Sequence, residues 1–387
     1  MYPNLFYLFR DLFGIEIPFL KVVNSFGFFV AIAFLVCAWV LAKELKRKQE
    51  QGLLTYKETA ITIGEPAGVL ELIINFVLGF FMGFKILGVM LVDGALNDPQ
   101  AFIFSAQGSW PAGIALGIFF TALKWREKNK DKLKKPEQRT IRIWPSDRIG
   151  DITIIAAVAG LVGAKIFDNL ENWDRFIQDP IKNLFSPSGL TFYGGLIVAT
   201  LCLWYYFKKN GIKFIIVADA AAPMLLLAYG LGRVGCQVSG DGDWGIINQR
   251  IKPFSWMPDW LWAYDYAHNV NGEGVLMTDC DWGVYCTQLQ IPVYPTPLYE
   301  IIIMLILFAI LWSVRKKFKV TGRIFSVYLV LNGLERFFIE KIRVNSTYNL
   351  FGFHPTQAEI ISTFLVLTGI VLYILAPRIK NTTYKLK

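Results

Sequence analysis

The sequence contains few charged residues and has long apolar stretches. Only 18% of its 387 residues are Asp, Glu, Lys or Arg, whereas 54% are hydrophobic. A soluble domain carries about a quarter charged residues, and about 20 apolar residues are enough to cross the hydrocarbon core of a bilayer. The composition therefore excludes a soluble globular domain and predicts an all-α polytopic membrane protein.

Other features are scarce or missing, and each absence narrows the function. The five cysteines occur singly, without the spacing of a metal site, so we expect neither a metal nor a cofactor. The first twenty residues contain Asp11 and Glu16 instead of a basic start and a cleavage site, which indicates that the first span is retained. No internal repeat is evident, although many transporters have one.

The distribution of basic residues predicts the topology. Of the 39 Lys and Arg residues, 27 fall in connections on one side of the predicted spans and 8 on the other. Cytoplasmic connections carry the excess of basic residues, so we expect the N-terminus outside, the C-terminus in the cytoplasm and no nucleic-acid partner for the net charge of +9. We predict nine spans, at 22–42, 66–92, 110–123, 150–170, 189–207, 214–236, 296–313, 324–340 and 355–376.

The spans divide the chain into four parts. We expect an N-terminal segment with the first span over 1–65, a membrane hairpin with a basic cytoplasmic loop over 66–149, a core over 150–376 and a cytoplasmic tail over 377–387. Residues 237–295 are the one long outward loop, and their seven acidic residues and five tryptophans predict a small periplasmic head at the membrane interface. Cys280 and Cys286 lie close together in this head, either as a disulfide or as two free thiols.

Four basic residues lie inside predicted spans: Lys85, Lys165, Arg233 and Arg336. A cation at the bilayer centre costs about 2.5–3.5 kcal/mol, so it is rare unless it faces a partner or a cavity. The two lysines can extend toward a span end. Arg233 and Arg336 lie in the outer half of their spans, where we expect no equal number of acidic residues within the membrane.

The two arginines have two interpretations. Arg336, Glu340 and Arg343 have the i, i+4, i+7 spacing of one helix face. An outer-leaflet arginine pair favours an anionic ligand, and the abundant anion there is a lipid phosphate, which arginine binds bidentately. The alternative is structural ion pairing of Arg336 with Glu340 and of Arg233 with Asp241.

Six short motifs occur over about 150–376: "TFYGGL", "VADAAAPMLLLAYGLGR", "GRVGCQVSGDGDWG" at 232–245, "PTPLYE", "ERFFIEKIR" and "TQAEIIS". In content and order they resemble the motifs of the bacterial prolipoprotein diacylglyceryl transferases, whose signature run is similar to "GRVGCQVSGDGDWG". The family core has seven spans, so the resemblance implies that the hairpin 66–123 is an insertion.

The sequence also departs from the family pattern. The family's Tyr in the first span is Phe26, its Arg in the following core span is Lys165, the Tyr before the ERFF motif is Asn332, and its His before the paired glycines is Tyr193. A neutral phenol is a poor base for a thiol. We therefore expect Tyr193 to orient substrate by hydrogen bonding, while His354 is either an interface residue or an assistant in the reaction.

The resemblance implies transfer of the diacylglyceryl group of phosphatidylglycerol to the lipobox cysteine of a prolipoprotein, in the bacterial inner membrane and toward its periplasmic leaflet. It implies that Arg233 and Arg336 hold the phosphate, with Tyr193 as the third catalytic residue, and that Cys236 is structural. The remaining expected binding residues, with Asp243 as a further orienting acid, are Gly194, Gly195, Asp241, Glu300, Glu340 and Arg343. Competing functions are a lipid transporter or flippase and a noncatalytic membrane scaffold. For the glycines, simple helix packing is the alternative.

Overall fold

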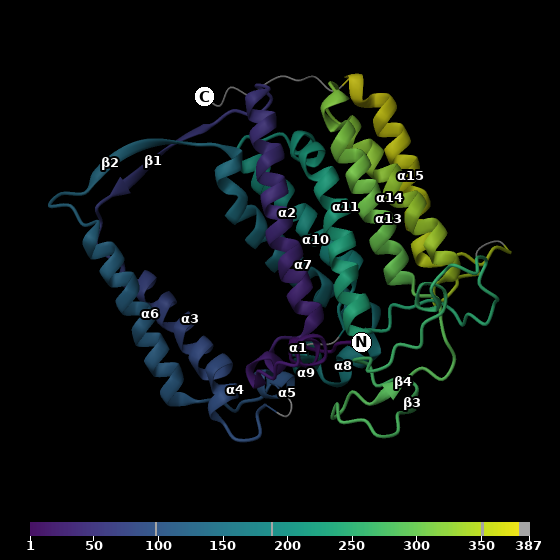
Figure 1. The fold of residues 1–387 in the computed structure, drawn as a ribbon. Helices are drawn as coiled ribbons and strands as arrows, with labels where there is room; N and C mark the ends of the chain where they lie inside the picture. Colours follow the sequence, from purple (N-terminus) through teal and green to yellow (C-terminus); the bar gives the residue numbers. More distant parts are fainter. Residues whose placement is uncertain (97–98, 187–188, 350–351, 379–387) are drawn as a thin grey trace.

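The computed structural model describes residues 1–96, 99–186, 189–349 and 352–378, and it shows a bundle of long helices with a separate helical hairpin beside it (Figure 1). Most of the predicted tail, from residue 379, lies outside the described residues. Each predicted span is helical. The helices are α2 (Ser25–Glu50), α3 (Val69–Phe81) continued by a π-helical turn η2 (Met82–Leu87) and α4 (Gly88–Leu91), α6 (Trp110–Lys130), α7 (Ile149–Glu171), α10 (Phe192–Lys209), α11 (Phe214–Ser239), α13 (Thr296–Val314), α14 (Arg323–Ile339) and α15 (Gln357–Leu375).

Six of these helices within the described residues are long and apolar enough to cross a membrane: α2, the α3 to α4 segment, α7, α11, α13 and α15. The protein is therefore a multi-pass membrane protein. At the other three predicted spans, α10 and α14 have only 18 and 17 residues, and α6 carries charged residues in its last turns. The full count of nine spans stays a prediction.

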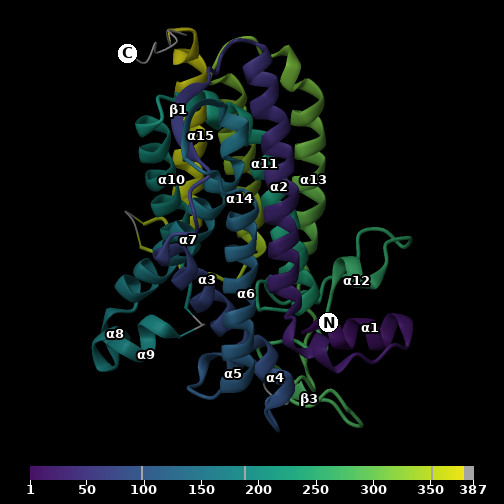
Figure 2. The ribbon, with the colours of Figure 1, turned by 90° about the vertical axis from the view of Figure 1, so that its left-hand side faces the viewer.

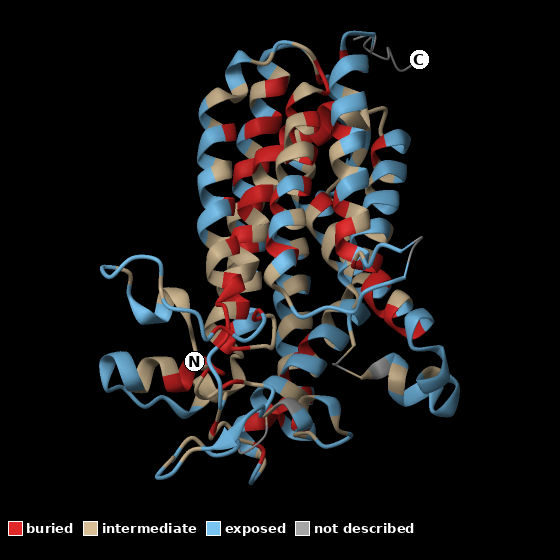
Figure 3. Ribbon diagram, turned by 90° about the vertical axis from the view of Figure 1, so that its right-hand side faces the viewer, coloured by how far each residue is buried: buried red, intermediate tan, exposed pale blue. Residues whose placement is uncertain are grey.

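Helix α11 lies at the centre of the bundle. It has the largest buried share of the six apolar helices, and its buried side chains contribute to apolar clusters with α2, α7 and α10 and with α13 and α14. Figure 3 shows the buried residues along the middle of the bundle and exposed residues on its outside. A helix that is apolar on all sides is buried by its neighbours. Because α13 and α14 pack against α11, the end of α11 lies among the ends of these two helices.

A carboxylate on α11 begins helix α14. Gly322, the residue before α14, has no side chain to cap the helix, and Asp219 of α11 accepts hydrogen bonds from the backbone N–H groups of Gly322 (2.7 Å) and Phe325 (2.9 Å). Asp219 is fully buried and pairs with Lys48 of α2 at 3.7 Å. The "VADAAAP" motif thus ties three helices together at the end of the bundle away from the N-terminus.

The hairpin of α3 and α6 is held together by small residues. A Cβ atom on Gly83 would lie 2.1 Å from the carbonyl oxygen of Ala112, so only glycine lets the two backbones approach this closely. At one end, strands β1 (Lys57–Ile63) and β2 (Glu137–Ile143) form an antiparallel ribbon that leads to the bundle. At the other end, α5 (Pro99–Phe104) contacts the turn η1 (Pro18–Val22).

The two connections 43–65 and 124–149 contain regular structure. Helix α2 continues to Glu50 and α6 to Lys130, and one strand of the β-ribbon follows each helix. The fold is mostly helical, as predicted, and the ribbon adds a short two-stranded sheet. Helix α6 extends past residue 123 into a basic stretch outside the apolar layer of the membrane. It can stay helical there because a helix satisfies its own backbone hydrogen bonds in water and in lipid alike.

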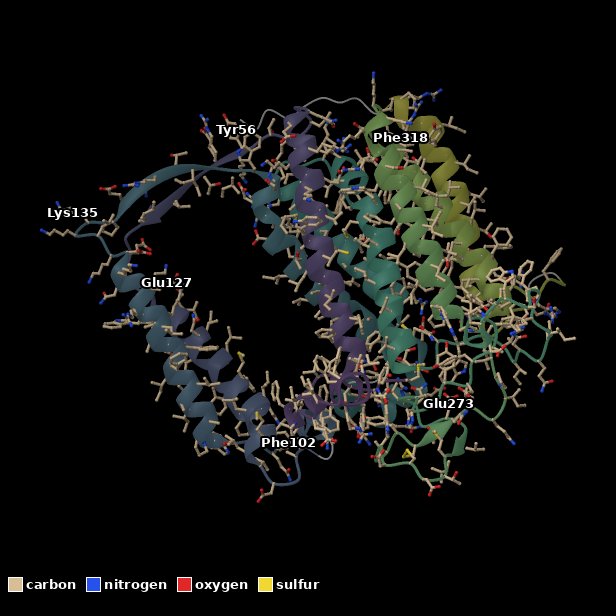
Figure 4. All side chains as sticks on the ribbon, in the orientation of Figure 1. Tyr56, Phe102, Glu127, Lys135, Glu273 and Phe318 are labelled. Atoms are coloured by element: carbon tan, nitrogen blue, oxygen red, sulfur yellow. A yellow bond between two sulfur atoms is a disulfide. The ribbon has the colours of Figure 1, made fainter. Side chains whose placement is uncertain are left out.

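The predicted outward and inward segments lie at opposite ends of the molecule. In Figure 4, Tyr56, Lys135 and Phe318 lie toward one end of the molecule, whereas Phe102 and Glu273 lie toward the other end, where Figure 1 marks the N-terminus. Figure 2 shows the short elements gathered at this N-terminal end. They include α1 (Leu5–Phe13), α8 (Trp173–Gln178), α9 (Pro180–Phe185), α12 (Asp259–Trp262), β3 (Val275–Leu276) and β4 (Thr287–Gln288).

The region 237–295 packs against the N-terminal segment. Tyr7 of α1 stacks on Trp282 at 4.4 Å between ring centroids, and His268 stacks on the same indole at 3.9 Å. Cys280 and Cys286 form a disulfide, which decides between the two alternatives left by the sequence. That this region forms a periplasmic head stays a prediction.

Candidate active site at the N-terminal end of the bundle

Arg233 lies in the last two turns of α11 and faces two carboxylates. Its Nη1 pairs with Oδ2 of Asp243, and its Nε lies 2.9 Å from Oε2 of Glu300. Helix α11 ends at Gly240, which has a left-handed conformation with φ of 64° that glycine adopts without strain. The chain reverses there, and Asp243 returns to face Arg233.

Glu300 is the centre of the site. It lies near the start of α13 and is 0% exposed. Besides Arg233, it pairs with Nη1 of Arg336 at 3.4 Å and with Nη1 of Arg343 at 3.5 Å. The hydroxyl of Tyr229 donates a hydrogen bond of 2.5 Å to Glu300 Oε1. One buried carboxylate therefore holds three guanidinium groups together.

The end of α14 supplies two of these arginines, although its geometry differs from the expected single helix face. The α-helix ends at Ile339, and a 3₁₀ turn over Glu340–Ile342 follows, closed by a hydrogen bond from Arg343 N–H to the Glu340 carbonyl. The i, i+7 helical spacing therefore does not extend to Arg343. The predicted pair of Arg336 and Glu340 is present at 3.1 Å.

The last glycine of the signature run positions the loop after α11. A Cβ atom on Gly245 would lie 2.4 Å from the carbonyl oxygen of Ile342, so any side chain there would push the loop away from the end of α14. Ile246 N–H donates to the same carbonyl at 2.8 Å. This close approach brings Asp243 Oδ1 to 2.7 Å from Arg343 Nη2.

The charges of the site are balanced. The sequence predicted no equal number of acidic residues within the membrane, and this is wrong, because each arginine is paired with carboxylates. Glu300 and Glu340 lie inside predicted spans, and Asp243 lies in the loop after α11. The three arginines are Arg233, Arg336 and Arg343, and the three carboxylates paired with them are Asp243, Glu300 and Glu340. The alternative pairing of Arg233 with Asp241 is replaced by pairing with Asp243.

Asp243 and Asp241 have different electrostatic environments. Burial disfavours the charged form of Asp243, but Arg233 and Arg343 outweigh it and lower its pKa to about 2. Burial, and then the charge of Asp243, raise the pKa of Asp241 above its usual value. These two carboxylates and the buried thiol of Cys236 place their ligand atoms within 4.8 Å of one another. The arginines already neutralise Asp243, so this arrangement does not favour a cation.

Helix α10 brings Tyr193 toward the cluster, while its glycines pack away from it. Tyr193 is partly buried and interacts electrostatically with Arg336. Cβ atoms on Gly194 and Gly195 would lie 2.7 Å from the carbonyl oxygens of Gly163 and Gly160 on α7. This placement fits the helix-packing alternative, and a role of the two glycines in substrate binding stays a prediction.

The other singled-out residues have contacts with groups outside the cluster. Lys85 donates hydrogen bonds to the backbone carbonyls of Phe102 and Gln107. These bonds satisfy its ammonium group near the end of a span. Lys165 is buried and donates to the Gly189 carbonyl at 3.4 Å. His354 lines a surface pocket beside Lys341 and Glu359.

Sequence reasoning missed three residues of the site. Thr296 Oγ1 donates to the Asp243 carbonyl at 2.8 Å and so fixes the loop on α13. Tyr229 lies one helical turn before Arg233, a spacing that could have predicted a shared face. Glu335 lies beside Arg336 in the quoted ERFF motif and is 7% exposed, but no role was given to it.

A cluster of arginines held by buried carboxylates at one end of a membrane bundle is typical of a membrane protein that binds an anionic group. Comparison with known proteins identifies the family. A family model described as prolipoprotein diacylglyceryl transferase matches residues 109–375, and the chain belongs to this family of transferases.

Several similar relatives are described as phosphatidylglycerol–prolipoprotein diacylglyceryl transferase. The relative from Corynebacterium diphtheriae is 30% identical over 211 residues, which cover 53% of this chain and 70% of the relative. One from Leptospira interrogans is 32% identical, covering 65% of this chain and 77% of the relative. One from Dehalococcoides mccartyi is 28% identical, covering 75% of this chain and 97% of the relative.

The extent of these matches bears on the hairpin. The last alignment covers nearly all of the relative and leaves a quarter of this chain unmatched, and the family match begins at residue 109, just before α6. This chain therefore carries additional sequence relative to that protein. The division into an inserted hairpin over 66–149 and a core over 150–376 stays a prediction.

Proposed function

We propose that this transferase moves the diacylglyceryl group of phosphatidylglycerol to the cysteine thiol in the lipobox segment of a prolipoprotein. In the reaction, a bond forms between the cysteine sulfur and a glycerol carbon, the bond from that carbon to the phosphate oxygen breaks, and glycerol phosphate leaves. Family membership supports this function and gives no support to a transporter or a scaffold.

The observation that carries the proposal is the convergence of Arg233, Arg336 and Arg343 on Glu300. The carboxylates fix the orientation of the guanidinium groups in advance. A guanidinium has five N–H donors, and Arg336 makes ion pairs through only its two terminal nitrogens. Donors therefore remain for a phosphate. Preorganised donors in a dry site stabilise negative charge that grows on a leaving oxygen.

We further propose the roles of the neighbouring groups. Arg233 and Arg336 bind the phosphate, and Glu300, Glu340 and Asp243 orient the arginines. Tyr193 donates a hydrogen bond that orients the headgroup or the incoming thiol. Asp241 forms part of the mouth of the site, and Cys236 is structural.

The proposed location is the bacterial cytoplasmic membrane, with the N-terminus outside and the site toward the periplasmic leaflet. The asymmetry of basic residues supports this orientation. Single cysteines introduced in 237–295 should react with a membrane-impermeant reagent added to whole cells, and those in 124–149 should not. The reverse pattern would contradict the orientation.

The function is tested with the purified protein, phosphatidylglycerol labelled in its acyl chains and a lipobox peptide with or without its cysteine. We expect label to appear on the peptide only when the cysteine is present, together with an equal amount of glycerol phosphate. Lipid movement without transfer would favour a transporter, and no activity of either kind would favour a scaffold.

A further inference from the structure

Glu335 is a buried carboxyl group that the proposed roles above do not use. It lies on α14 directly before Arg336 and is 7% exposed. Both of its carboxylate oxygens are buried, and neither has a hydrogen-bond partner among the described residues. Buried polar atoms are rarely left without a partner, and an exception calls for an explanation such as a catalytic role.

Glu335 lies within electrostatic range of the arginine cluster. It interacts electrostatically with Glu300 from α13, with Arg233 and Tyr229 from α11, and with Arg336 and Arg343 from its own helix and the turn after it. A group held by these arginines would therefore bind in the neighbourhood of Glu335.

The charge balance of the site favours the neutral, protonated form of Glu335 when the lipid phosphate is bound. The three arginines are already neutralised by Asp243, Glu300 and Glu340. An ionised Glu335 would be a further buried anion without a direct partner, which costs several kcal/mol, and it would repel the lipid phosphate. A neutral carboxylic acid has neither disadvantage, and it carries a proton.

We propose that Glu335 is a proton-transfer residue, whose neutral carboxyl group donates its proton to the leaving phosphate. This inference rests on the proposed function. As the sulfur–carbon bond forms, the carbon–oxygen bond breaks with its electron pair on the phosphate oxygen, and the phosphate takes the proton from Glu335. The proton lost by the substrate thiol restores the carboxyl group, so that the cycle moves one proton from sulfur to phosphate.

The test uses Glu335→Gln in the full-length protein, with the same labelled lipid and lipobox peptide. Glutamine keeps the shape and the neutral charge of the acid but cannot transfer a proton. We expect kcat to fall by about 10²-fold or more, with KM for phosphatidylglycerol within about twofold of the wild type. In the wild type, ionisation of Glu335 should lower the rate at high pH. This loss should be absent in Glu335→Gln. A structural role predicts a nearly unchanged kcat, because glutamine packs in the same way.

Glu359 provides a matched control. It is also a buried carboxyl group at this end of the bundle, but it is hydrogen-bonded in the capping box of α15 with Thr356 and paired with Lys341. Glu359→Gln should lower the melting temperature and leave kcat and its pH profile unchanged. An equal loss of kcat in both variants would overturn the inference.

Two further results complete the test. If Glu335→Gln does not fold, Glu335→Asp decides: a lower kcat with a shifted high-pH limb supports proton transfer, and a wild-type profile overturns it. If the wild type transfers label and Glu335→Gln matches it, only the role of Glu335 fails. If the wild type transfers none, the proposed function fails.

Discussion

The two ends of the bundle each contain a buried ionic cluster, and the clusters differ in how completely their atoms are paired. At the end away from the N-terminus, Glu44 accepts hydrogen bonds from Arg47 and Arg315, and Asp219 accepts two backbone N–H groups and pairs with Lys48. At the N-terminal end, buried atoms of the arginine cluster lack a well-aligned hydrogen bond. They are Arg233 Nε, Arg343 Nε, Glu300 Oε2, Glu340 Oε2 and both oxygens of Glu335.

We propose that this difference separates a structural cluster from a functional one. A buried cluster whose carboxylates are hydrogen-bonded fixes neighbouring helices and leaves few carboxylate oxygens to bind a ligand. A cluster that is balanced in charge but incompletely hydrogen-bonded keeps donors and acceptors for a substrate. Charge inside a membrane is therefore informative about function only together with its hydrogen-bond partners.

The largest expected effect is on Arg233. Arg233→Ala should reduce transfer by about 10³-fold or more, because it removes a donor to the phosphate and leaves Glu300 underpaired in a dry site. Arg233→Lys should recover little, because an ammonium group cannot reproduce a bidentate fork. Initial rates of label transfer, normalised to folded protein, measure this. Near-normal activity of the alanine variant would remove the phosphate-binding role.

The next prediction concerns the cluster at the other end. Glu44→Gln should destabilise the protein by about 3–5 kcal/mol, because it leaves Arg47 and Arg315 without their buried partner. The variant that remains folded should keep its kcat. Thermal unfolding in detergent and the transfer rate are measured on the same sample. A selective loss of kcat without loss of stability would break the comparison.

Tyr193 should have a smaller effect. If it only orients substrate, Tyr193→Phe should lower the rate by about 10-fold, near the net contribution of one hydrogen bond of about 0.5–1.5 kcal/mol. A pH–rate profile of wild type, Tyr193→Phe, Tyr193→His and His354→Gln tests this. A loss of orders of magnitude in the phenylalanine variant, restored by histidine with an acid-shifted profile, would instead assign proton transfer to position 193.

The smallest expected effect is the pH dependence from Asp243. Its pKa in the folded protein is about 2, below the usual value of about 3.9, so ionised Asp243 stabilises the folded state. This contribution is present above about pH 4 and is lost as the pH falls toward about 2. The difference in melting temperature between wild type and Asp243→Asn should be constant from pH 5 to 8 and shrink below pH 4. A difference that grows on acidification would contradict the pairing with Arg233 and Arg343.

Much of this architecture follows from the sequence, because apolar length and the excess of basic residues act locally. Each predicted span is helical, and "GRVGCQVSGDGDWG" and "ERFFIEKIR" do meet. The partners of the arginines could not be assigned in this way. Arg233 pairs with Asp243 and not Asp241, because the left-handed turn at Gly240 and the close approach of Gly245 to Ile342 set the register of the loop.

The β-ribbon and Glu335 show two further limits. Residues 57–63 and 137–143 are far apart in the sequence, and their pairing depends on the hairpin between them. Glu335 is adjacent to a recognised arginine, yet only the three-dimensional arrangement shows that its oxygens lack partners. Burial without a partner is a property of packing, which residue spacing does not report.

The most direct test of the central claim compares Arg336→Ala with Arg315→Ala in the transfer assay, at equal amounts of folded protein. Both variants remove a partly buried arginine that is paired with a buried carboxylate, one at each end of the bundle. We predict that Arg336→Ala lowers kcat by about 10²- to 10³-fold or more, while Arg315→Ala lowers stability and keeps kcat within a few-fold of the wild type. Equal losses of kcat in the two variants would contradict the claim that the N-terminal cluster is the phosphate-binding site.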